Sequence, residues 1–313
     1  LFIRRSKWKC ALMRLQNGAT EILCAGRLYC DLIFSGVPRM PTLGTEVFAN
    51  DLTLCAGGGA FITAATLQAL GKSTSLLATL PSAPFDGVVK TDIQNCNVNA
   101  RRCRPASENL SPQITVAIAN STDRAFLSHQ AGTAIPDIST GDFDGLRHLH
   151  IGELRSLIEH PNLIEQARAA GLTISLDCGW DDEVMAGEID ATEIISAVDI
   201  FFPNQVEFDR LTALGLRADL TPLTVVKCGA DGARALNNRG WLAVPCEPTH
   251  VIDATGAGDS FNGGFLSVWL DNGPLDRCLE RGNSCGHPAV QTKGGTGAHY
   301  NWNNLNCLTN RPA

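Results

Sequence analysis

Three features are scarce in this 313-residue sequence, and each absence excludes a class of protein. No apolar run approaches the roughly 20 residues that a membrane-spanning helix needs, so no transmembrane segment is expected. Basic residues are not in excess, because 25 Lys and Arg stand against 32 Asp and Glu, a net charge of −7. Nucleic acids and anionic membrane surfaces select basic proteins, so neither is expected as the main partner.

The 12 cysteines lack the C-x-x-C spacing that is typical of zinc sites and thioredoxin-like centres. Several, such as Cys24, Cys178 and Cys228, lie in or beside apolar strand-like runs, where a reduced thiol packs as a small hydrophobic side chain. The basic stretch of residues 1–14 is not followed by the apolar segment of a secretory signal. These absences predict buried, reduced cysteines and a cytoplasmic protein.

Strand-like and helix-like segments alternate along most of the chain. Apolar strands are expected at 21–26, 75–80, 148–151, 172–177, 198–202 and 223–228, and helices at 60–70, 162–170, 205–214 and 257–270. Near-continuous apolar strands separated by helices indicate a mostly parallel sheet that is covered on both faces. The sequence therefore predicts an α/β protein with three layers, α/β/α.

Two stretches break this alternation, because residues 33–56 and 107–130 hold β-prone segments without helices between them. We expect them to form a small β-strand lid, inserted in two pieces into one large nucleotide-binding α/β domain of residues 1–32, 57–106 and 131–313. Exposed strand edges favour pairing, so a homodimer through the lid is a hypothesis.

Two short segments suggest activities that their surroundings do not support. Residues 70–74 read Leu-Gly-Lys-Ser-Thr, but a phosphate-binding loop needs a glycine where Thr66 stands and a helix after the lysine. Gly258-Asp259-Ser260 suggests a GDS-type serine hydrolase in which Ser260 attacks an ester. Such a nucleophile needs a histidine base oriented by a carboxylate, and neither downstream histidine lies in an Asp-x-x-His arrangement. The hydrolase remains a minor alternative.

Residues 253–265, Asp-Ala-Thr-Gly-Ala-Gly-Asp-Ser-Phe-Asn-Gly-Gly-Phe, combine features that suit phosphoryl transfer. Small residues at 254–258 let a turn approach a ligand closely and then enter a helix, whose first N–H groups can hold a phosphate. Asp259 would stand beside that phosphate, where a carboxylate suits a general base that takes a proton from an attacking hydroxyl. A helix cap would explain Asp259, but not the small residues before it or the second acid, Asp253.

This segment resembles the C-terminal signature of the ribokinase-like, PfkB-type carbohydrate kinases over all thirteen residues. Further landmarks of that family follow in order over nearly the whole chain: the first strand with its acid at 26–31, the di-glycine switch at 57–60, Asn-x-x-Glu at 204–207, a nucleotide-loop strand end at 227–232 and a late loop at 294–295. The resemblance implies an enzyme that uses ATP and Mg²⁺ to phosphorylate a primary hydroxyl of a sugar or sugar-like alcohol.

The resemblance also implies roles for individual residues. The general base would be Asp259, beside a backbone anion hole of Gly256, Ala257 and Gly258. Substrate would meet Asp31, Gly58, Gly59, Thr63 and Glu153, and the nucleotide and its Mg²⁺ would meet Asn204, Glu207, Lys227, Gly229, Gly232 and Asn283. A monovalent cation such as K⁺ would lie, chiefly on backbone carbonyls, among Asp253, Thr255, Ala289, Thr292, Gly294 and Ala298.

Some of these residues have simpler explanations, which the sequence leaves open. Asn204 and Glu207 also fit a helix N-cap with a first-turn acid, and Glu153 also fits a surface acid. Thr63 stands where sugar-binding members commonly carry asparagine, and it lacks the paired donor and acceptor of an amide. The usual sugar contacts are therefore in doubt, while phosphoryl transfer is not.

Two alternatives share the fold that the resemblance implies. A nucleoside kinase of the same family would use the same mechanism, but it needs a more apolar wall around the base. A silent sugar-binding protein would keep the fold, but the intact Asp259 argues against it. The polar run of residues 281–288, with Pro288 where a helix would continue, has no explanation in the sequence.

Overall fold

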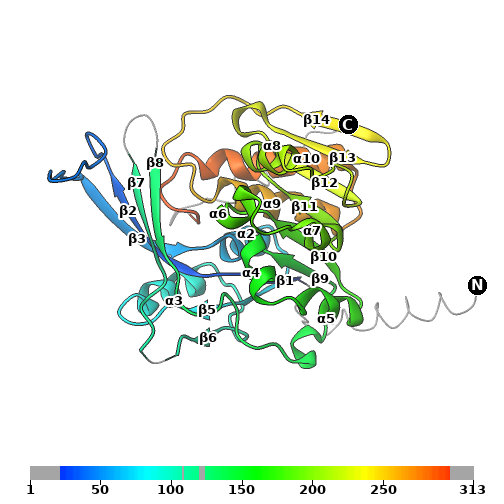
Figure 1. The fold of residues 1–313 in the computed structure, drawn as a ribbon, viewed down its shortest axis with the longest axis horizontal. Helices are drawn as coiled ribbons and strands as arrows, with labels where there is room; N and C mark the ends of the chain where they lie inside the picture. Colours follow the sequence, from blue (N-terminus) through cyan, green and yellow to red (C-terminus); the bar gives the residue numbers. More distant parts are fainter. Residues whose placement is uncertain (1–21, 108, 120–123, 297–313) are drawn as a thin grey trace, which may run out of the picture.

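An eight-stranded sheet forms the centre of the computed structural model, which describes residues 22–107, 109–119 and 124–296 (Figure 1). Its strands follow the order β14-β13-β12-β11-β10-β9-β1-β4. Their bounds are β1 Ile22–Ala25, β4 Thr74–Leu77, β9 His148–Ile151, β10 Thr173–Asp177, β11 Ile200–Phe202, β12 Leu223–Lys227, β13 Ala233–Asn237 and β14 Gly240–Val244. All neighbours from β4 to β12 are parallel, whereas the pairs β12–β13 and β13–β14 are antiparallel.

Helices cover both faces of this sheet (Figure 1). Alternate residues of β1 point to opposite faces, so Ile22 and Cys24 join one hydrophobic cluster and Leu23 and Ala25 join the other. The first cluster includes side chains of α2 (Gly59–Ala69), α3 (Asp86–Asn95), α9 (Ala257–Trp269) and α10 (Leu275–Ala289). The second includes α4 (Leu154–Glu159), α5 (Leu163–Ala169), α6 (Asp182–Ala186), α7 (Thr192–Ser196) and α8 (Gln205–Ala213). The predicted three-layer α/β/α fold is confirmed.

The helices α9 and α10 pack closely because small residues line their contact. A Cβ atom on Gly264 would lie 2.6 Å from the carbonyl oxygen of Arg281, and one on Gly282 would lie 2.5 Å from the ring of Phe261. Cys278 and Cys285 are fully buried on the same side of α10. Pro288 lies in the last turn of α10, where its missing N–H costs the helix only one hydrogen bond. Within the run of residues 281–288, Gly282 and Cys285 are buried against α9 and the other residues are half-buried, so the run is part of a helix that packs one side on the core.

A second sheet forms the lid, beside the central sheet (Figure 1). Its order is β3-β2-β7-β8, with β2 Tyr29–Ser35, β3 Asp51–Gly57, β7 Ile114–Ala119 and β8 Arg124–His129. These strands fall mostly within the two predicted lid segments, but β2 begins at Tyr29, ahead of the predicted boundary at residue 33. The short strands β5 (Thr79–Leu80) and β6 (Arg104–Pro105) pair near the lid's base.

Most predicted elements are present, with differences at short strands and hairpins. The run 75–80 is divided between β4 of the central sheet and β5 of the small sheet. The hairpin β13–β14 and the helices α3, α4, α6, α7 and α10 were not predicted. Two 3₁₀ turns complete the elements, η1 at Thr140–Phe143 and η2 at Gly229–Asp231. Among the helices of the described ranges, none is long and apolar enough to span a membrane.

Candidate active site

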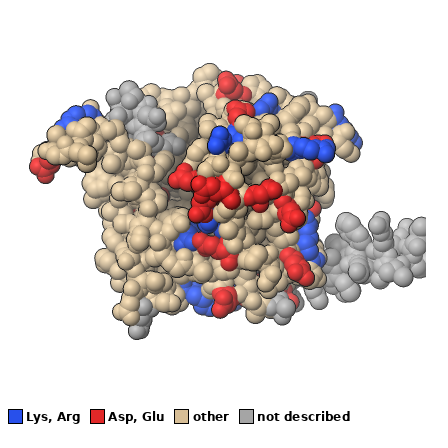
Figure 2. All heavy atoms as spheres, viewed as in Figure 1, with Lys and Arg blue, Asp and Glu red and all other residues tan. Residues whose placement is uncertain are grey.

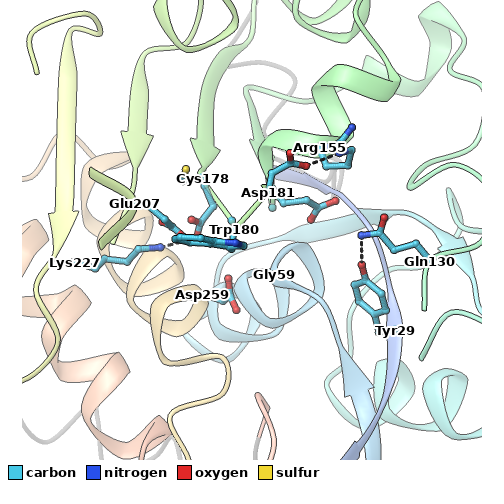
Figure 3. Close-up of a pocket in the computed structure, with 14 residues that line it drawn as sticks. Tyr29, Gly59, Gln130, Arg155, Cys178, Trp180, Asp181, Glu207, Lys227 and Asp259 are labelled. Carbon is cyan, nitrogen blue, oxygen red and sulfur yellow. Dashed lines mark hydrogen bonds and ion pairs between the residues drawn. The ribbon is translucent and has the colours of Figure 1, made fainter. Parts of the chain in front are cut away.

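A cavity of about 320 Å³ opens at the carboxyl ends of β9 to β12, beside the N-terminus of α9. This edge of a parallel sheet is where ligands bind in open α/β folds. Acidic side chains gather beside the hollow on this face of the molecule (Figure 2). Five carboxylates line the cavity, those of Glu153, Asp177, Asp181, Glu207 and Asp259, and two cations, Arg155 and Lys227 (Figure 3).

Asp259 lies in the first turn of α9 and faces the cavity (Figure 3). A Cβ atom on Gly59 would lie 2.7 Å from its Oδ1, so only glycine at 59 lets this carboxylate sit over the start of α2. Burial, the nearby Asp177 and other acids raise the pKa of Asp259 to about 7, against the opposing effect of Lys227. A carboxyl group with this pKa can both take up and release a proton near neutral pH.

An ion pair between Lys227 and Asp177 crosses the floor of the cavity. The Nζ of Lys227 lies 2.7 Å from Oδ2 of Asp177, and the Asn262 amide donates to the same oxygen. Burial alone would lower the pKa of Lys227, but Asp177, Glu207 and Asp259 together hold it above its ordinary value. Lys227 therefore stays charged between two strand ends and the first turn of α9.

Asn204 and Glu207 form a reciprocal capping box at the start of α8. The Glu207 N–H donates to Oδ1 of Asn204 at 2.9 Å, and the Asn204 N–H donates to Oε2 of Glu207 at 2.8 Å. Glu207 is nevertheless buried at the cavity wall, where burial and Asp177 raise its pKa to about 7. The helix cap explains the geometry of both residues. The position of Glu207 at the cavity wall also allows its carboxylate to contact a ligand.

A second cavity, of about 250 Å³, adjoins the first on the other side of Lys227. Its walls are mostly apolar or small, and they include Ala230, Val251, Ala257, Phe261 and Val290. Among the residues predicted to meet the nucleotide, this cavity contains Lys227, Gly229, Gly232 and Asn283. The Asn283 amide donates to the carbonyls of Val244 and Pro245, which fixes the loop after β14 against α10.

The turn before α9 brings the predicted anion hole between the two cavities. Gly256 has φ 73°, and a Cβ atom there would lie 2.5 Å from Cα of Gly295, so this position requires glycine. The Ala257 N–H already donates to the carbonyl of Ala254. The N–H groups of residues 258 and 259 are then the first-turn donors that a helix leaves without an intrahelical partner.

Residues from both sheets line the first cavity (Figure 3). Tyr29 comes from β2 and Gln130 follows β8, and the Gln130 amide donates to the Tyr29 hydroxyl at 3.0 Å. Glu153 follows β9, and burial raises its pKa to about 7. Arg155 reaches the same space while it is ion-paired with Asp181 and Glu183.

Asp31 lies away from this cavity, under the glycines that precede α2. A Cβ atom on Gly57 would lie 2.1 Å from Oδ2 of Asp31, and Gly58, with φ 108°, caps α2. Burial and the charge of Asp253 raise the pKa of Asp31 to about 7. Asp31 is therefore not among the residues that line the main cavity.

Asp253 organises the loops that were predicted to hold a monovalent cation. Its Oδ1 accepts from the N–H and hydroxyl of Thr255, and its Oδ2 accepts from the Gly294 N–H at 2.9 Å. Thr292 bonds to the carbonyl of Ala289 at the end of α10. The sixth predicted residue, Ala298, lies outside the described residues. Within the described ranges no group of three or more His, Cys, Asp or Glu side chains is placed to hold a metal ion.

Two sequence interpretations do not fit the packing. Thr63 is completely buried and lines neither cavity, and its hydroxyl donates to the carbonyl of Asp259 at 3.1 Å, so it fixes α2 to α9. Ser260 is 0% exposed and its Oγ has no hydrogen-bond partner among the described residues, so it cannot attack an ester. The hydrolase alternative is therefore wrong.

The cysteines of the described ranges are free thiols, ten in number. Six of them are buried, and Cys178 lines the first cavity while Cys246 lines the second. Burial raises the pKa of Cys178 well above its ordinary value, which keeps it as an unreactive thiol.

Sequence reasoning missed several residues of the site, of which Asp177 is the most important. Its position as the last residue of a predicted strand at the carboxyl edge of the sheet was the available signal. Gln130, Arg155, Trp180 and Asp181 came from segments without a recognisable motif, and Tyr29 lies within the landmark at 26–31 but was given no role there. Only the folded chain brings these residues together.

Comparison with known proteins agrees with the fold. The model of the pfkB family carbohydrate kinases matches residues 20–300. An ATP-dependent ribose-1-phosphate kinase of Halopiger xanaduensis is 25% identical over 274 residues, 85% of this chain and 90% of that protein. A nucleoside kinase of Methanocaldococcus jannaschii is 25% identical over 284 residues, which cover 88% and 91%.

The solved ribokinase of Arabidopsis thaliana, complexed with ribose and ATP, has a TM-score of 0.76 at 18% identity, over 93% of this chain and 98% of that one. The chain belongs to the pfkB family of carbohydrate kinases. It is a sugar kinase, and thus a phosphotransferase, as the sequence predicts.

Proposed function

We propose that this enzyme transfers the γ-phosphate of ATP to a primary hydroxyl of an uncharged sugar or sugar-like alcohol, with Asp259 as the general base. The observation that carries the proposal is the position of Asp259 at the N-terminus of α9, between a polar cavity and an apolar one. The apolar cavity suits the adenosine part of ATP, and the polar cavity suits a polyol.

In this proposal Asp259 takes the proton of the acceptor hydroxyl as its oxygen attacks the γ-phosphorus. The bond from that phosphorus to the β-phosphate oxygen breaks, and ADP leaves. The first-turn N–H groups and the positive end of α9 stabilise the transferring phosphate, and Lys227 adds a fixed charge. Positioning and charge stabilisation suffice for this reaction, and no covalent enzyme intermediate is needed.

The acids of the cavity fit a Mg²⁺ ion that accompanies ATP. Asp177, Glu207 and Asp259 stand around one ammonium group, and burial, followed by the charge of Asp177, raises the pKa values of Glu207 and Asp259. Mg²⁺ prefers oxygen ligands and usually takes only one or two carboxylates besides phosphate and water. Glu207 and Asn204 would hold it through water, and it would supply charge neutralisation at the phosphates.

Two features bear on whether the acceptor is a sugar or a nucleoside. The polar, carboxylate-lined cavity favours a free polyol, and the relatives include kinases named for a sugar phosphate and for nucleosides. The test is ATP consumption with Mg²⁺ over ribose, fructose, ribose 1-phosphate, cytidine and adenosine. We expect the highest kcat/KM with an uncharged sugar. We also expect greater activity in KCl than in NaCl at equal ionic strength, because a monovalent cation would bind around Asp253.

The outcomes of this panel separate the alternatives. Turnover of nucleosides but not sugars would favour the nucleoside kinase. No ATP-dependent product with any of the five acceptors would contradict the proposed reaction.

We further propose that two copies associate through the outer face of the lid. The strand register places Leu32, Leu52, Leu54, Val116 and Leu127 on one face of the lid sheet. Leu54 is 41% exposed and Leu127 is 72% exposed, whereas Leu32 packs partly against the core, so among the described residues this apolar face is uncovered around Leu54 and Leu127. The same apolar face of a second copy could pack against it and bury both surfaces.

Sizing in solution tests this association. The 33.4 kDa chain should elute as a dimer, and Leu54→Glu should shift it to a monomer because it buries a charge in the contact. The control Val206→Glu changes an exposed residue of α8 and should leave the dimer intact. A wild-type chain that elutes as a monomer at micromolar concentration would refute the association.

We also propose that the enzyme works in the cytoplasm. The reaction consumes ATP, and free thiols such as Cys178 persist in a reducing compartment.

A further inference from the structure

Arg27 is a buried arginine at the junction of the lid and the α/β domain. It lies in the short connection between β1 and β2, where the chain leaves the central sheet for the lid. Only 2% of its surface is exposed, and it is the largest of the fully buried side chains in the described ranges. A charged side chain is seldom buried so completely unless its partners fix it in place.

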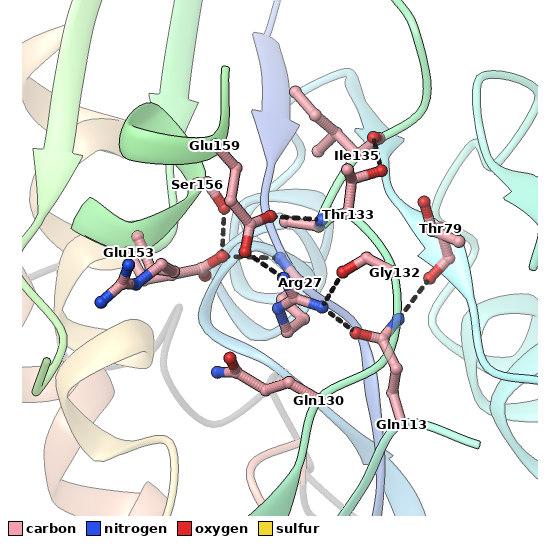
Figure 4. A network of polar contacts seen from close by, with 12 residues as sticks. Arg27, Thr79, Gln113, Gln130, Gly132, Thr133, Ile135, Glu153, Ser156 and Glu159 are labelled. Atoms are coloured by element: carbon pink, nitrogen blue, oxygen red, sulfur yellow. Dashed lines mark hydrogen bonds and ion pairs between the residues drawn. The ribbon is translucent and has the colours of Figure 1, made fainter. Parts of the chain in front are cut away.

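The guanidinium of Arg27 joins three segments that are distant in sequence (Figure 4). One nitrogen donates to Oε1 of Gln113, directly before β7, and to the carbonyl of Gly132 at 3.1 Å, shortly after β8. The other donates to Oε1 of Glu159 at the end of α4. Both ends of the β7–β8 hairpin are therefore tied to the α/β domain through one side chain.

The partners of Arg27 are themselves held. Oε2 of Glu159 accepts from the Ala134 N–H at 2.8 Å, on the chain that leaves the lid. The Gln113 carbonyl accepts from the Cys30 N–H at 3.1 Å, so β2 and β7 are also joined beside the side chain of Arg27's partner Gln113. Arg27 thus stands at the centre of a network that fixes the base of the lid.

The same residue also contacts the wall of the active site. The backbone N–H of Arg27 donates to Oε1 of Glu153 at 2.8 Å, and the Ser156 hydroxyl donates to the same oxygen (Figure 4). Two residues after Arg27 comes Tyr29, and two residues before Gly132 comes Gln130, the pair that meets across the cavity. Arg27 therefore connects the lid residues that line the cavity with Glu153, which also lines it.

Stability alone does not explain a charge in this place. Removing a guanidinium from water is costly, and a well-packed apolar side chain of similar size often stabilises such a position at least as well. Arg27 is matched by a single carboxylate, and its Nε has no hydrogen-bond partner among the described residues. What arginine adds is a planar fork of donors that fixes several groups in defined directions.

We infer that Arg27 is a positioning residue that aligns Tyr29 and Gln130 of the lid with Glu153, so that the acceptor's hydroxyl reaches Asp259 correctly. The inference rests on the proposed function. It assigns to Arg27 the binding geometry of the acceptor, and not that of ATP, whose proposed cavity lies beyond Lys227. A small misplacement of an acceptor is enough to lower its reaction rate strongly.

The variant Arg27→Met tests the inference, because it keeps the length of the side chain and removes the fork. We expect KM for the best acceptor to rise at least about tenfold and KM for ATP to change less than about twofold. Backbone amides of β7 and β8 should exchange with deuterium faster than in the wild type, while those of β9 and β10 should not.

The matched control is Arg168→Met. The guanidinium of Arg168 also bonds one carboxylate, of Asp199, and two backbone carbonyls, but at the amino ends of β10 and β11, away from the site. It should lower the free energy of unfolding without changing either KM. If Arg27→Met raises both KM values equally, or neither, the positioning role is refuted.

A second variant covers the case in which Arg27→Met does not fold. Glu159→Gln keeps the shape of the partner and removes its charge, and it should raise KM for the acceptor but not for ATP. Equal effects on both constants would overturn the inference. If the wild type phosphorylates no acceptor, the proposed function fails, while unchanged exchange at β7 and β8 would still refute the anchor.

Discussion

Replacing Asp259 with asparagine should lower kcat about a thousandfold, because general-base catalysis contributes roughly 10²–10⁴ to such a step. Asparagine keeps the size of the side chain but cannot take the acceptor's proton. The raised pKa shows that folding disfavours the charged form, so the free energy of unfolding above pH 7 should not fall. The measurements are kcat with the best acceptor, ATP binding by calorimetry and unfolding in urea.

The pH dependence offers an independent check on the same residue. The base works only when ionised, so with a pKa of about 7 for Asp259 the wild-type kcat/KM should fall as the pH drops below 7. The residual activity of Asp259→Asn should lack this limb. Asp271→Asn removes an exposed acid of the same protein and should leave rate and profile unchanged. An Asp259→Asn variant within tenfold of the wild-type rate would rule out the mechanism.

The second large effect is expected from Lys227→Met, which leaves Asp177 without its cation. The side chains of this pair are 12% and 7% exposed, and breaking a buried pair by removing one partner costs about 3–5 kcal/mol. Lys227 also lowers the pKa values of Glu207 and Asp259. The variant should therefore be less stable to urea and should require a higher pH for its residual activity.

Two companion variants make this result interpretable. Lys72→Met breaks the pair with Asp271, whose carboxylate is largely exposed, and should cost less than about 1 kcal/mol. The double variant Lys227→Met, Asp177→Asn should recover part of the lost stability, because no unpaired charge remains. If Lys227→Met unfolds at the wild-type urea concentration, the pair does not hold these strand ends together.

The sequence predicted the parts of the fold that depend on strong local patterns. Apolar strands such as residues 223–228 and the small-residue turn before Asp259 each carry their signal within a few neighbouring positions. The helix α10 shows why other parts were missed. Its buried residues are Cys278, Leu279, Gly282, Cys285 and Ala289, of which only Leu279 is a large apolar side chain. Small residues fit the close approach of α9, but they give a weak apolar pattern in the sequence.

The candidate site divides in the same way. Residues 256–259 could be assigned from one segment, because a helix start provides both the donors and the base. Asp177, Tyr29 and Gln130 could not, because they meet only when β10 and the two halves of the lid are assembled. Thr63 was assigned to the substrate from the family resemblance alone, and in the fold it makes a buried contact between two helices.

The two cavities meet at Lys227 and at the first turn of α9, so their occupants would lie next to each other. The same arrangement favours a linked inhibitor: an adenosine group joined through a short anionic chain to a polyol would occupy both cavities at once. Its second half would bind at the high effective concentration that a short linker imposes, so its affinity could exceed that of either fragment by orders of magnitude.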